Sequence, residues 1–285
     1  MILEAAIGDA YGAGFEFRDL DFISQNNNLT QYHKHGLYTE IYKRYTDDTQ
    51  MAIAITELLL EDDNWNEIKV VDKFVEVFHR DKRRGYSDRV YNALDASTNG
   101  ADFIKIINNG SNGNGSAMRA YSIGYLKDIK QIVEFCEIQA KTSHLTVEGI
   151  SCAKRIALAV HYFKYNLGDG ATLTAFLNET LKENENYSIT SPIDMHGYPT
   201  TRAVIKIVSD ATSMKDCLKT SIDYGGDTDT VAALCMAILS QKQNCEKTLP
   251  QFLYDELEND KFGKDFLIKL DTALDNKFNC HEKNL

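Results

Sequence analysis

The fold is decided by the stretch Tyr224-Gly225-Gly226-Asp227-Thr228-Asp229-Thr230-Val231-Ala232-Ala233-Leu234. The diglycine allows a tight turn or a close approach of two backbones, and the apolar residues that follow it have helical spacing. Asp227 or Thr228 can cap that helix, which is the purely structural interpretation. One cap, however, does not need two Asp-Thr pairs in succession.

A second stretch near the other end of the chain has the same order of residue types. It reads Arg44-Tyr45-Thr46-Asp47-Asp48-Thr49-Gln50-Met51-Ala52, with hydroxyls and carboxylates placed before an apolar helix. Two carboxylate-rich helix starts can converge on a hard cation through oxygen ligands alone. The pattern therefore predicts a site for magnesium, manganese or calcium rather than for zinc.

Composition narrows the class of protein. The chain has 285 residues, a net charge of -11 and six cysteines without zinc-like spacing. The acidic balance argues against a nucleic-acid or anionic-membrane binder, and scattered cysteines are typical of reduced thiols. The N-terminus lacks the features of a signal peptide, and no run approaches the length of a membrane span. We expect a cytoplasmic protein.

Hydrophobic periodicity predicts helices almost throughout and hardly any strands. The expected helices cover 2–12, 48–60, 66–79, 88–96, 101–107, a short one from about 116, 129–141, 146–166, 172–184, 199–210, 214–223, one after the diglycine, 250–258 and 264–278. Residues 18–44 are polar and irregular and predict a surface loop. The sequence shows no repeat and no linker, so the fold class is all-α, with one domain over residues 1–285.

Glu16 is a candidate acid or base. It lies in the small-residue turn Gly8-Asp9-Ala10-Tyr11-Gly12-Ala13-Gly14-Phe15-Glu16-Phe17, where two flanking phenylalanines would desolvate it and raise its pKa. From this stretch alone, a solvated glutamate is the more common case. His33 and His35 lack a third metal-binding partner nearby, which disfavours a metal site between them.

A glycine-rich loop is a candidate anion site. In Gly110-Ser111-Asn112-Gly113-Asn114-Gly115-Ser116-Ala117-Met118-Arg119 the glycines can expose successive N–H groups before a helix. The loop is neither a P-loop nor a dinucleotide fingerprint, and a plain turn explains it equally well. His144, just before a helix start, would have a lowered pKa and remain neutral; a capping or core role is the alternative.

Four motifs in this order resemble the ADP-ribosylglycohydrolase family. They are Gly8-Asp9-x-x-Gly12-x-x-x-Glu16, Thr46-Asp47-Asp48-Thr49, Gly113-Asn114-Gly115-Ser116-Ala117-Met118-Arg119 and Gly225-Gly226-Asp227-Thr228-Asp229-Thr230. The resemblance runs from about residue 2 to about 240 and leaves 245–285 unmatched. It implies an all-α bundle with two magnesium ions at the base of a cleft; manganese also accepts such oxygen ligands.

The resemblance also implies roles for individual residues. The metal ligands would be Thr46, Asp47, Asp48, Asp227, Asp229 and Thr230. Glu16 would face the scissile bond, with Glu16 or a metal-bound water as the base and Asp48 or a metal-bound group assisting departure. The diphosphate loop, with Met118 after it, would supply Ser111, Asn112, Gly113, Asn114, Gly115 and Ser116, and His144 would lie near the distal ribose.

The implied function is removal of ADP-ribose from mono-ADP-ribosylated proteins, with arginine as the favoured acceptor and ADP-ribose as the product. A different ADP-ribosyl bond, to serine, nucleic acid or a metabolite, is one alternative. A second alternative is a non-catalytic or immunity-type protein that binds an ADP-ribosyltransferase. The complete set of metal-ligand positions argues against a purely structural role.

Overall fold

The computed structural model describes residues 1–279, which fold into α-helices and one 3-10 helix. In chain order the elements are α1 (Ile2–Gly12), α2 (Leu20–Asn26), α3 (Asp47–Glu61), α4 (Glu67–Arg80), α5 (Asp88–Ala96), α6 (Gly100–Ile106), α7 (Gly115–Met118), η1 (Tyr121–Tyr125), α8 (Ile129–Lys141), α9 (Val147–Lys164), α10 (Gly170–Leu181), α11 (Gly197–Asp210), α12 (Met214–Asp223), α13 (Thr228–Gln241), α14 (Phe252–Asp255) and α15 (Lys264–Asn279). Within these residues extended backbone makes only isolated β-bridges. The all-α prediction is confirmed.

Two predicted segments need correction. The expected loop over 18–44 contains α2, which begins at Leu20 because the Asp19 carboxylate caps it by accepting a hydrogen bond from the Phe22 N–H at 2.7 Å. The expected helix over 250–258 is only the single turn α14. Beyond it the chain bends so that the Glu258 N–H donates to the Lys43 carbonyl at 2.9 Å. This long-range contact replaces the next helical turn.

Helix α1 lies directly against α13, backbone to backbone. A Cβ on Gly8 would come within 2.5 Å of the Ala232 carbonyl oxygen, and one on Gly12 within 2.5 Å of the Thr228 carbonyl oxygen. The Thr228 hydroxyl donates to the Gly12 carbonyl at 2.8 Å. Two glycines one turn apart therefore permit the approach that sets the end of α1 beside the start of α13.

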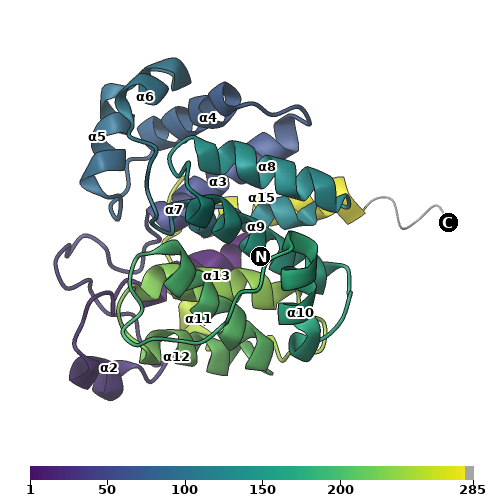
Figure 1. Cartoon of the computed structure of the whole chain (residues 1–285). Helices are drawn as coiled ribbons and strands as arrows, with labels where there is room; N and C mark the ends of the chain where they lie inside the picture. Colours follow the sequence, from purple (N-terminus) through teal and green to yellow (C-terminus); the bar gives the residue numbers. More distant parts are fainter. Residues whose placement is uncertain (280–285) are drawn as a thin grey trace.

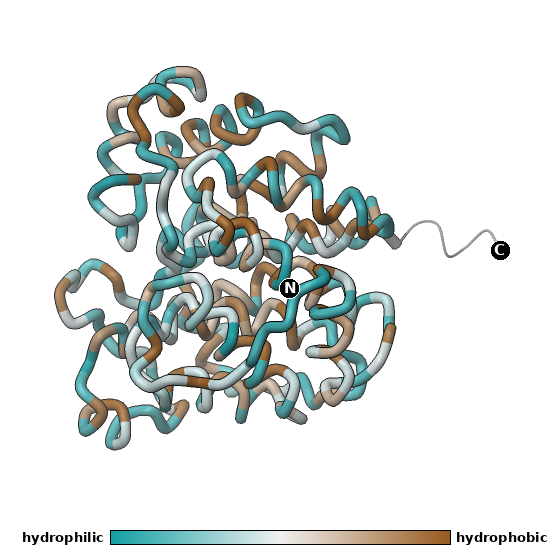
Figure 2. Tube along the Cα trace, in the orientation of Figure 1, coloured by the Kyte–Doolittle hydropathy of each residue, from teal (hydrophilic) through white to brown (hydrophobic). Residues whose placement is uncertain are grey.

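The remaining helices are arranged around this pair. Helices α4, α5 and α6 gather at one end of the molecule and α10, α11 and α12 at the other, with α13 between them (Figure 1). Figure 2 shows hydrophobic residues recurring along the helices while many of the connecting segments are hydrophilic. One hydrophobic cluster extends from Met1 to Leu274. In residues 1–279 no helix is both long and apolar enough to cross a membrane.

The C-terminal helix, which the sequence motifs left without a role, anchors the N-terminal one. Helix α15 packs on α1 and α3. The Asp271 carboxylate accepts hydrogen bonds from the backbone N–H groups of Ile2 at 2.9 Å and Leu3 at 3.1 Å. It thereby satisfies the first free donors of α1, as a capping side chain does.

The cysteines of the described chain are all free. Those at positions 136, 152, 217 and 235 are buried and Cys245 is partly buried, whereas Cys280 lies outside the described residues. Burial raises the pKa of Cys152 to about 12, which makes this thiol inert. The free thiols agree with the prediction from their spacing.

Candidate active site

The starts of α3 and α13 place the two acidic stretches around one cavity. Asp47 and Asp48 open α3, and Thr46 caps it, since its Oγ1 accepts a hydrogen bond from the Asp48 N–H at 3.4 Å. Asp227 occupies the cap position of α13, yet its side chain makes no capping bond. Its Oδ2 accepts instead from Asn114 Nδ2 at 2.5 Å. The capping interpretation thus fails for Asp227.

Glu16 reaches the same place from the turn after α1. Carboxylate oxygens of Glu16, Asp227 and Asp229 lie within 4.8 Å of one another. Phe17, with a φ of 51°, donates its N–H to the Gly226 carbonyl at 2.9 Å, which fixes the turn against the diglycine. Only one flanking aromatic ring shields Glu16, because Phe15 is buried while Phe17 is 52% exposed.

The cavity between these elements has a volume of about 300 Å³. The residues that line it are Glu16, Asp47, Asp48, Met51, Gly85, Tyr86, Ser87, Arg89, Val90, Ser111, Gly113, Asn114, Gly115, Met118, Arg119, His144, Met195, Asp227, Asp229 and Thr230. Its acidic wall is formed by Asp47, Asp48, Asp227, Asp229 and Glu16. The rest of its lining includes the glycine-rich loop, Arg89, Arg119 and His144. We call this part the opposite wall, and the bond from Asn114 to Asp227 joins it to the acidic wall.

Burial and charge repulsion both disfavour ionised carboxylates in the acidic wall. Burial, followed by the neighbouring carboxylates, raises the pKa of Asp47, Asp48 and Asp229 well above the usual range. Burial also raises the pKa of Asp227 to about 6, and hydrogen bonds from Asp229 and Asn114 limit the rise. Within residues 1–279 no salt bridge engages any of these four aspartates. Such a group cannot be fully ionised at neutral pH without an added cation.

The donor set fits a hard divalent cation. Asp48 Oδ1 is buried and has no hydrogen-bond partner among the described residues. The Thr230 hydroxyl lies beside Asp48 and Asp227 and lowers the pKa of both. Carboxylate and hydroxyl oxygens in a partly buried cluster, without thiolate or imidazole, are the ligands that magnesium and manganese accept.

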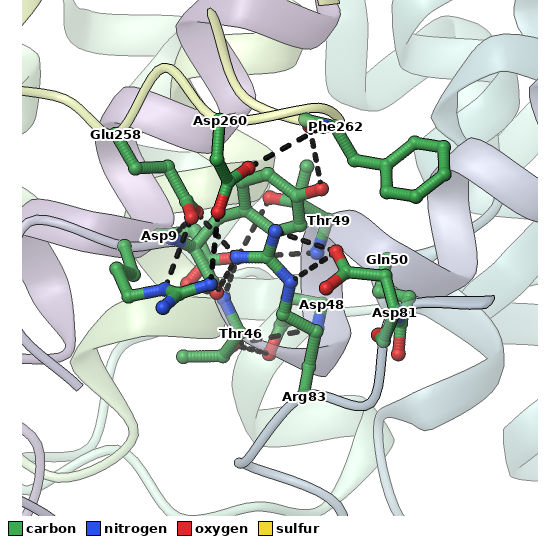
Figure 3. Close-up of polar contacts among 12 residues, drawn as sticks. Asp9, Thr46, Asp48, Thr49, Gln50, Asp81, Arg83, Glu258, Asp260 and Phe262 are labelled. Atoms are coloured by element: carbon green, nitrogen blue, oxygen red, sulfur yellow. Dashed lines mark hydrogen bonds and ion pairs between the residues drawn. The ribbon is translucent and has the colours of Figure 1, made fainter. Parts of the chain in front are cut away.

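A buried polar network supports the start of α3 (Figure 3). Asp9 of α1 accepts hydrogen bonds from the Thr46 N–H at 3.0 Å, the Thr49 N–H at 3.1 Å and the Thr49 hydroxyl at 2.6 Å. On the other side Arg83, 5% exposed, bonds to the Tyr45 carbonyl at 3.3 Å and forms an ion pair with Glu258. The segment after α14 therefore helps to hold the α3 start in place.

The Asp47 carboxylate occupies the space that a side chain at position 85 would fill, so this position requires glycine. A Cβ at this position would lie 2.0 Å from Asp47 Oδ1, and the φ of 111° strains any other residue. The Arg84 carbonyl accepts a hydrogen bond from the Asp47 N–H at 3.1 Å. The segment between α4 and α5 thus forms a cradle for Asp47.

The glycine-rich loop differs from an open anion-binding nest. The Gly113 N–H donates to Ser111 Oγ at 3.0 Å and the Asn114 N–H to the Met195 carbonyl at 2.9 Å. Ser111, Gly113, Asn114, Gly115 and Met118 still line the cavity. The loop is therefore pinned by its own backbone amides and presents only part of itself to a ligand.

His144 lines the same cavity. Its Nδ1 is 2.8 Å from Ser143 Oγ, and its ring is close enough that a Cβ on Gly115 would meet Cε1 at 2.9 Å. Burial lowers its pKa well below the usual value, and the charges of Arg119 and Arg89 lower it further. The direction agrees with the prediction, but the main cause is burial rather than the start of α9.

Three predicted residues do not line the cavity. Ser116 Oγ donates to the Gly149 carbonyl at 2.7 Å, and the Asn112 carbonyl accepts from the Gly197 N–H at 2.9 Å. Thr46 is buried behind the wall with Oγ1 3.5 Å from Asp48 Oδ2.

His33 packs edge-on against the Phe15 and Phe22 rings, whereas His35 bonds to Glu16, so the two histidines do not share a site.

Several lining residues escaped the sequence analysis. Met51 of α3, Arg89 and Val90 of α5, and Met195 reach the cavity from three different segments. Arg89 follows shortly after the Gly85 turn, and this proximity was an available signal. No sequence signal pointed to Met195, which lies on the segment between α10 and α11. It is placed at the cavity by the hydrogen bond that its carbonyl accepts from the Asn114 N–H.

The chain is similar to several known proteins. The family model for ADP-ribosylglycohydrolase matches residues 1–281. A protein of Xenopus tropicalis named ADP-ribosylhydrolase ARH3 is 26% identical over 83% of this chain and 84% of its own length. The ARH3 of Gallus gallus is 30% identical over 55% of this chain and 47% of its own. A solved structure titled ADP-ribosylglycohydrolase-related protein complex superposes with a TM-score of 0.70 at 17% identity, covering 96% of this chain and 94% of that one.

The fold and the carboxylate-lined cavity define a helical hydrolase. The chain belongs to the ADP-ribosylglycohydrolase family. The family acts on ADP-ribosylated substrates, releases ADP-ribose and depends on metal ions. The match also reaches beyond residue 240, where the sequence motifs ended.

Proposed function

We propose that this enzyme releases ADP-ribose from arginine side chains of mono-ADP-ribosylated proteins with the help of two magnesium ions. The proposal is carried by one observation: four buried aspartates that form no salt bridge within residues 1–279 share a cavity with Glu16. Asp47, Asp48, Asp227, Asp229 and Thr230 would hold the ions, with Thr46 adjacent to Asp48. Manganese would fit the same oxygen ligands.

When bound, the ions would fix the ribose hydroxyls and ease deprotonation of water. The chain itself supplies the remaining steps. A water oxygen attacks C1″ as the bond from C1″ to the arginine nitrogen breaks, through an oxocarbenium-like transition state. Glu16 takes a proton of that water, and the protonated guanidinium of the substrate leaves as neutral guanidine with the bonding electron pair, its departure assisted by Asp48. The pinned loop and His144 hold the rest of the ligand in the opposite wall, which supplies orientation.

The experiment measures release of ADP-ribose from an arginine-ADP-ribosylated protein with magnesium, with manganese and with EDTA. Serine-linked and nucleic-acid-linked substrates are assayed alongside. We expect metal-dependent release from arginine. Release only from another linkage would retain the site and replace the acceptor.

A binding role is tested separately. The hydrolase proposal is wrong under two joint conditions. The wild-type protein would release no ADP-ribose, and it would bind an ADP-ribosyltransferase as well as the Asp227→Ala variant does. Comparing Glu16→Gln with wild type then tests the base, because the amide cannot accept the proton of water at neutral pH.

A further inference from the structure

Glu16 is held by a histidine from the segment that follows α2. His35 is 3% exposed, and its Nε2 lies 2.7 Å from Glu16 Oε2. No hydrogen bond among residues 1–279 engages the other oxygen, Oε1, although Glu16 lines the cavity. One carboxylate oxygen is thus anchored and the other is available to a ligand.

The surroundings of His35 determine which ring nitrogen carries the proton. Backbone N–H groups of Leu37 and Tyr38 both donate to Nδ1, at 2.9 Å and 3.0 Å. A nitrogen that accepts hydrogen bonds cannot itself carry a proton. The ring is therefore the neutral tautomer with its hydrogen on Nε2, pointing at Glu16.

The ring is also fixed in place. The Tyr38 ring stacks on it with centroids 5.2 Å apart and an interplanar angle of 27°. The His35 N–H donates to the Ile41 carbonyl at 3.1 Å, and Arg18 Nη2 donates to the Lys34 carbonyl at 3.3 Å. Rotating the imidazole would break both part-buried hydrogen bonds to Nδ1 and the stacking with Tyr38.

We propose that His35 is a positioning residue for hydrolysis, one that holds Glu16 through Oε2 so that Oε1 can accept the proton of the attacking water. The inference rests on the proposed function, in which Glu16 is the base. A neutral donor suits this position because it orients the carboxylate without adding a cation that would compete with metal ions for the acidic wall. Fixing a flexible glutamate in one orientation is a direct contribution to rate.

Two substitutions separate positioning from folding of the loop. In His35→Asn the side-chain oxygen can still accept the amides of Leu37 and Tyr38, as asparagine does in turns, but nothing donates to Glu16. We expect kcat to fall roughly 10- to 100-fold, the range typical of supporting groups around a site, with KM nearly unchanged. His35→Gln reaches Glu16 with an amide N–H and should restore part of kcat.

His33→Asn is the matched control, since His33 belongs to the same segment and contacts Phe15 and Phe22 instead of Glu16. It should keep the wild-type kcat. A readout independent of activity is the long-range ¹H–¹⁵N NMR spectrum of the His35 ring, which should show protonated Nε2 and unprotonated Nδ1.

Two results would overturn the role of His35 alone. One is a His35→Asn variant that keeps the full kcat of an active wild-type enzyme, and the other is a His35 ring protonated on Nδ1. A wild-type protein that releases no ADP-ribose would overturn the proposed function, and this role with it. The two failures are distinguishable because only the second affects the wild-type chain.

Discussion

The two walls of the cavity differ in how their buried charges are compensated. In the acidic wall, carboxylates from α3, α13 and the turn after α1 crowd together, and the pKa values of Asp47, Asp48 and Asp229 rise. No salt bridge within residues 1–279 engages these aspartates. In the opposite wall, the Arg119 guanidinium is buried among neutral acceptors: Nε donates to Gln139 Oε1 at 2.6 Å and Nη2 to Ser143 Oγ at 2.9 Å. Its charge also lies over the Phe74 ring at 4.7 Å.

The difference indicates what each wall requires. Burial lowers the pKa of Arg119, but a guanidinium stays protonated at neutral pH, and its neutral partners leave its charge uncancelled. Protein groups thus satisfy the hydrogen bonds of Arg119, and the opposite wall remains positively charged. The carboxylates of the acidic wall, in contrast, need added cations to balance their negative charge. A ligand with a metal-binding diol at one end and an anionic group at the other matches this separation.

The largest effect should follow from removing one charge of the acidic wall. In Asp227→Asn the side chain can still accept from Asn114, but it no longer binds a cation strongly. We expect kcat/KM to fall roughly 1000-fold, a loss of about 4 kcal/mol, while the melting temperature of the metal-free protein rises because repulsion is relieved. Activity assays and thermal melts check both signs.

Asp210→Asn is the control, since this exposed aspartate pairs only with Lys206 on the surface. It should leave both quantities unchanged. Full activity of Asp227→Asn would remove the cation-binding role from the acidic wall.

Gly85→Ala should disturb the same wall through Asp47. The new Cβ would displace the Asp47 carboxylate and strain the backbone, so we expect about a 10- to 100-fold loss of activity, as for other supporting positions. Isothermal titration should show weaker magnesium binding. Combined with Asp47→Asn, the loss should be much less than the sum of the two single losses, because both act through one group; an additive pair would refute the cradle.

The acidic wall should also make stability depend on pH. The folded-state pKa of Asp227 is raised from 3.8 to about 6, and those of Asp47, Asp48 and Asp229 are raised too. A raised pKa means that the carboxyl group keeps its proton to a higher pH in the folded state than in the unfolded state. The free energy of unfolding therefore falls as pH increases through these values. Differential scanning calorimetry should show the metal-free protein melting a few °C lower at about pH 8 than at about pH 6.

Magnesium should remove most of that difference, because it compensates the ionised carboxylates. Surface carboxylates are ionised at both pH values and contribute little to the change. A melting temperature that is independent of pH and of magnesium would contradict the account of the acidic wall.

The smallest effect is expected in the opposite wall. Arg89 is half-buried and bonds to the Ser143 carbonyl at 3.5 Å and to the Asn108 carbonyl. Arg89→Gln should raise KM about 3- to 10-fold without changing kcat, the signature of an interaction equal in ground and transition states. Lys105→Gln, an exposed charge loss on α6, is the control. A fall in kcat for Arg89→Gln would place this residue closer to the chemistry.

The sequence predicted the helices and the acidic stretches with good accuracy because both have local causes. Helical periodicity and capping residues act within a few positions, and α3, α9 and α13 begin close to where these signals stand. It failed at α2 and at the residues after α14. In the first case a single Asp19 cap decides the helix, and in the second a contact with Lys43 ends it.

The site was predicted in type but not in detail. Asp-Thr pairs indicated the oxygen-rich wall, whereas the exclusion of Ser116 and Asn112 from the cavity depends on hydrogen-bond partners more than 30 residues away in the chain. The His35 contact with Glu16 was equally hidden. Adjacent residues on one segment, His33 and His35, face different partners, and no local pattern distinguishes them.

By itself the sequence determined the all-α class and the two acidic helix starts, since these follow from periodicity and from local residue types. It also predicted oxygen ligands for a divalent cation, which stays a prediction. Only the tertiary structure decided which oxygen atoms meet. The close approach of α1 to α13 through Gly8 and Gly12 brings Glu16 beside Asp227, and the Glu258–Arg83 pair braces the start of α3 from the far end of the chain. These are contacts between segments remote in sequence, fixed by packing and buried charge, which no local pattern encodes.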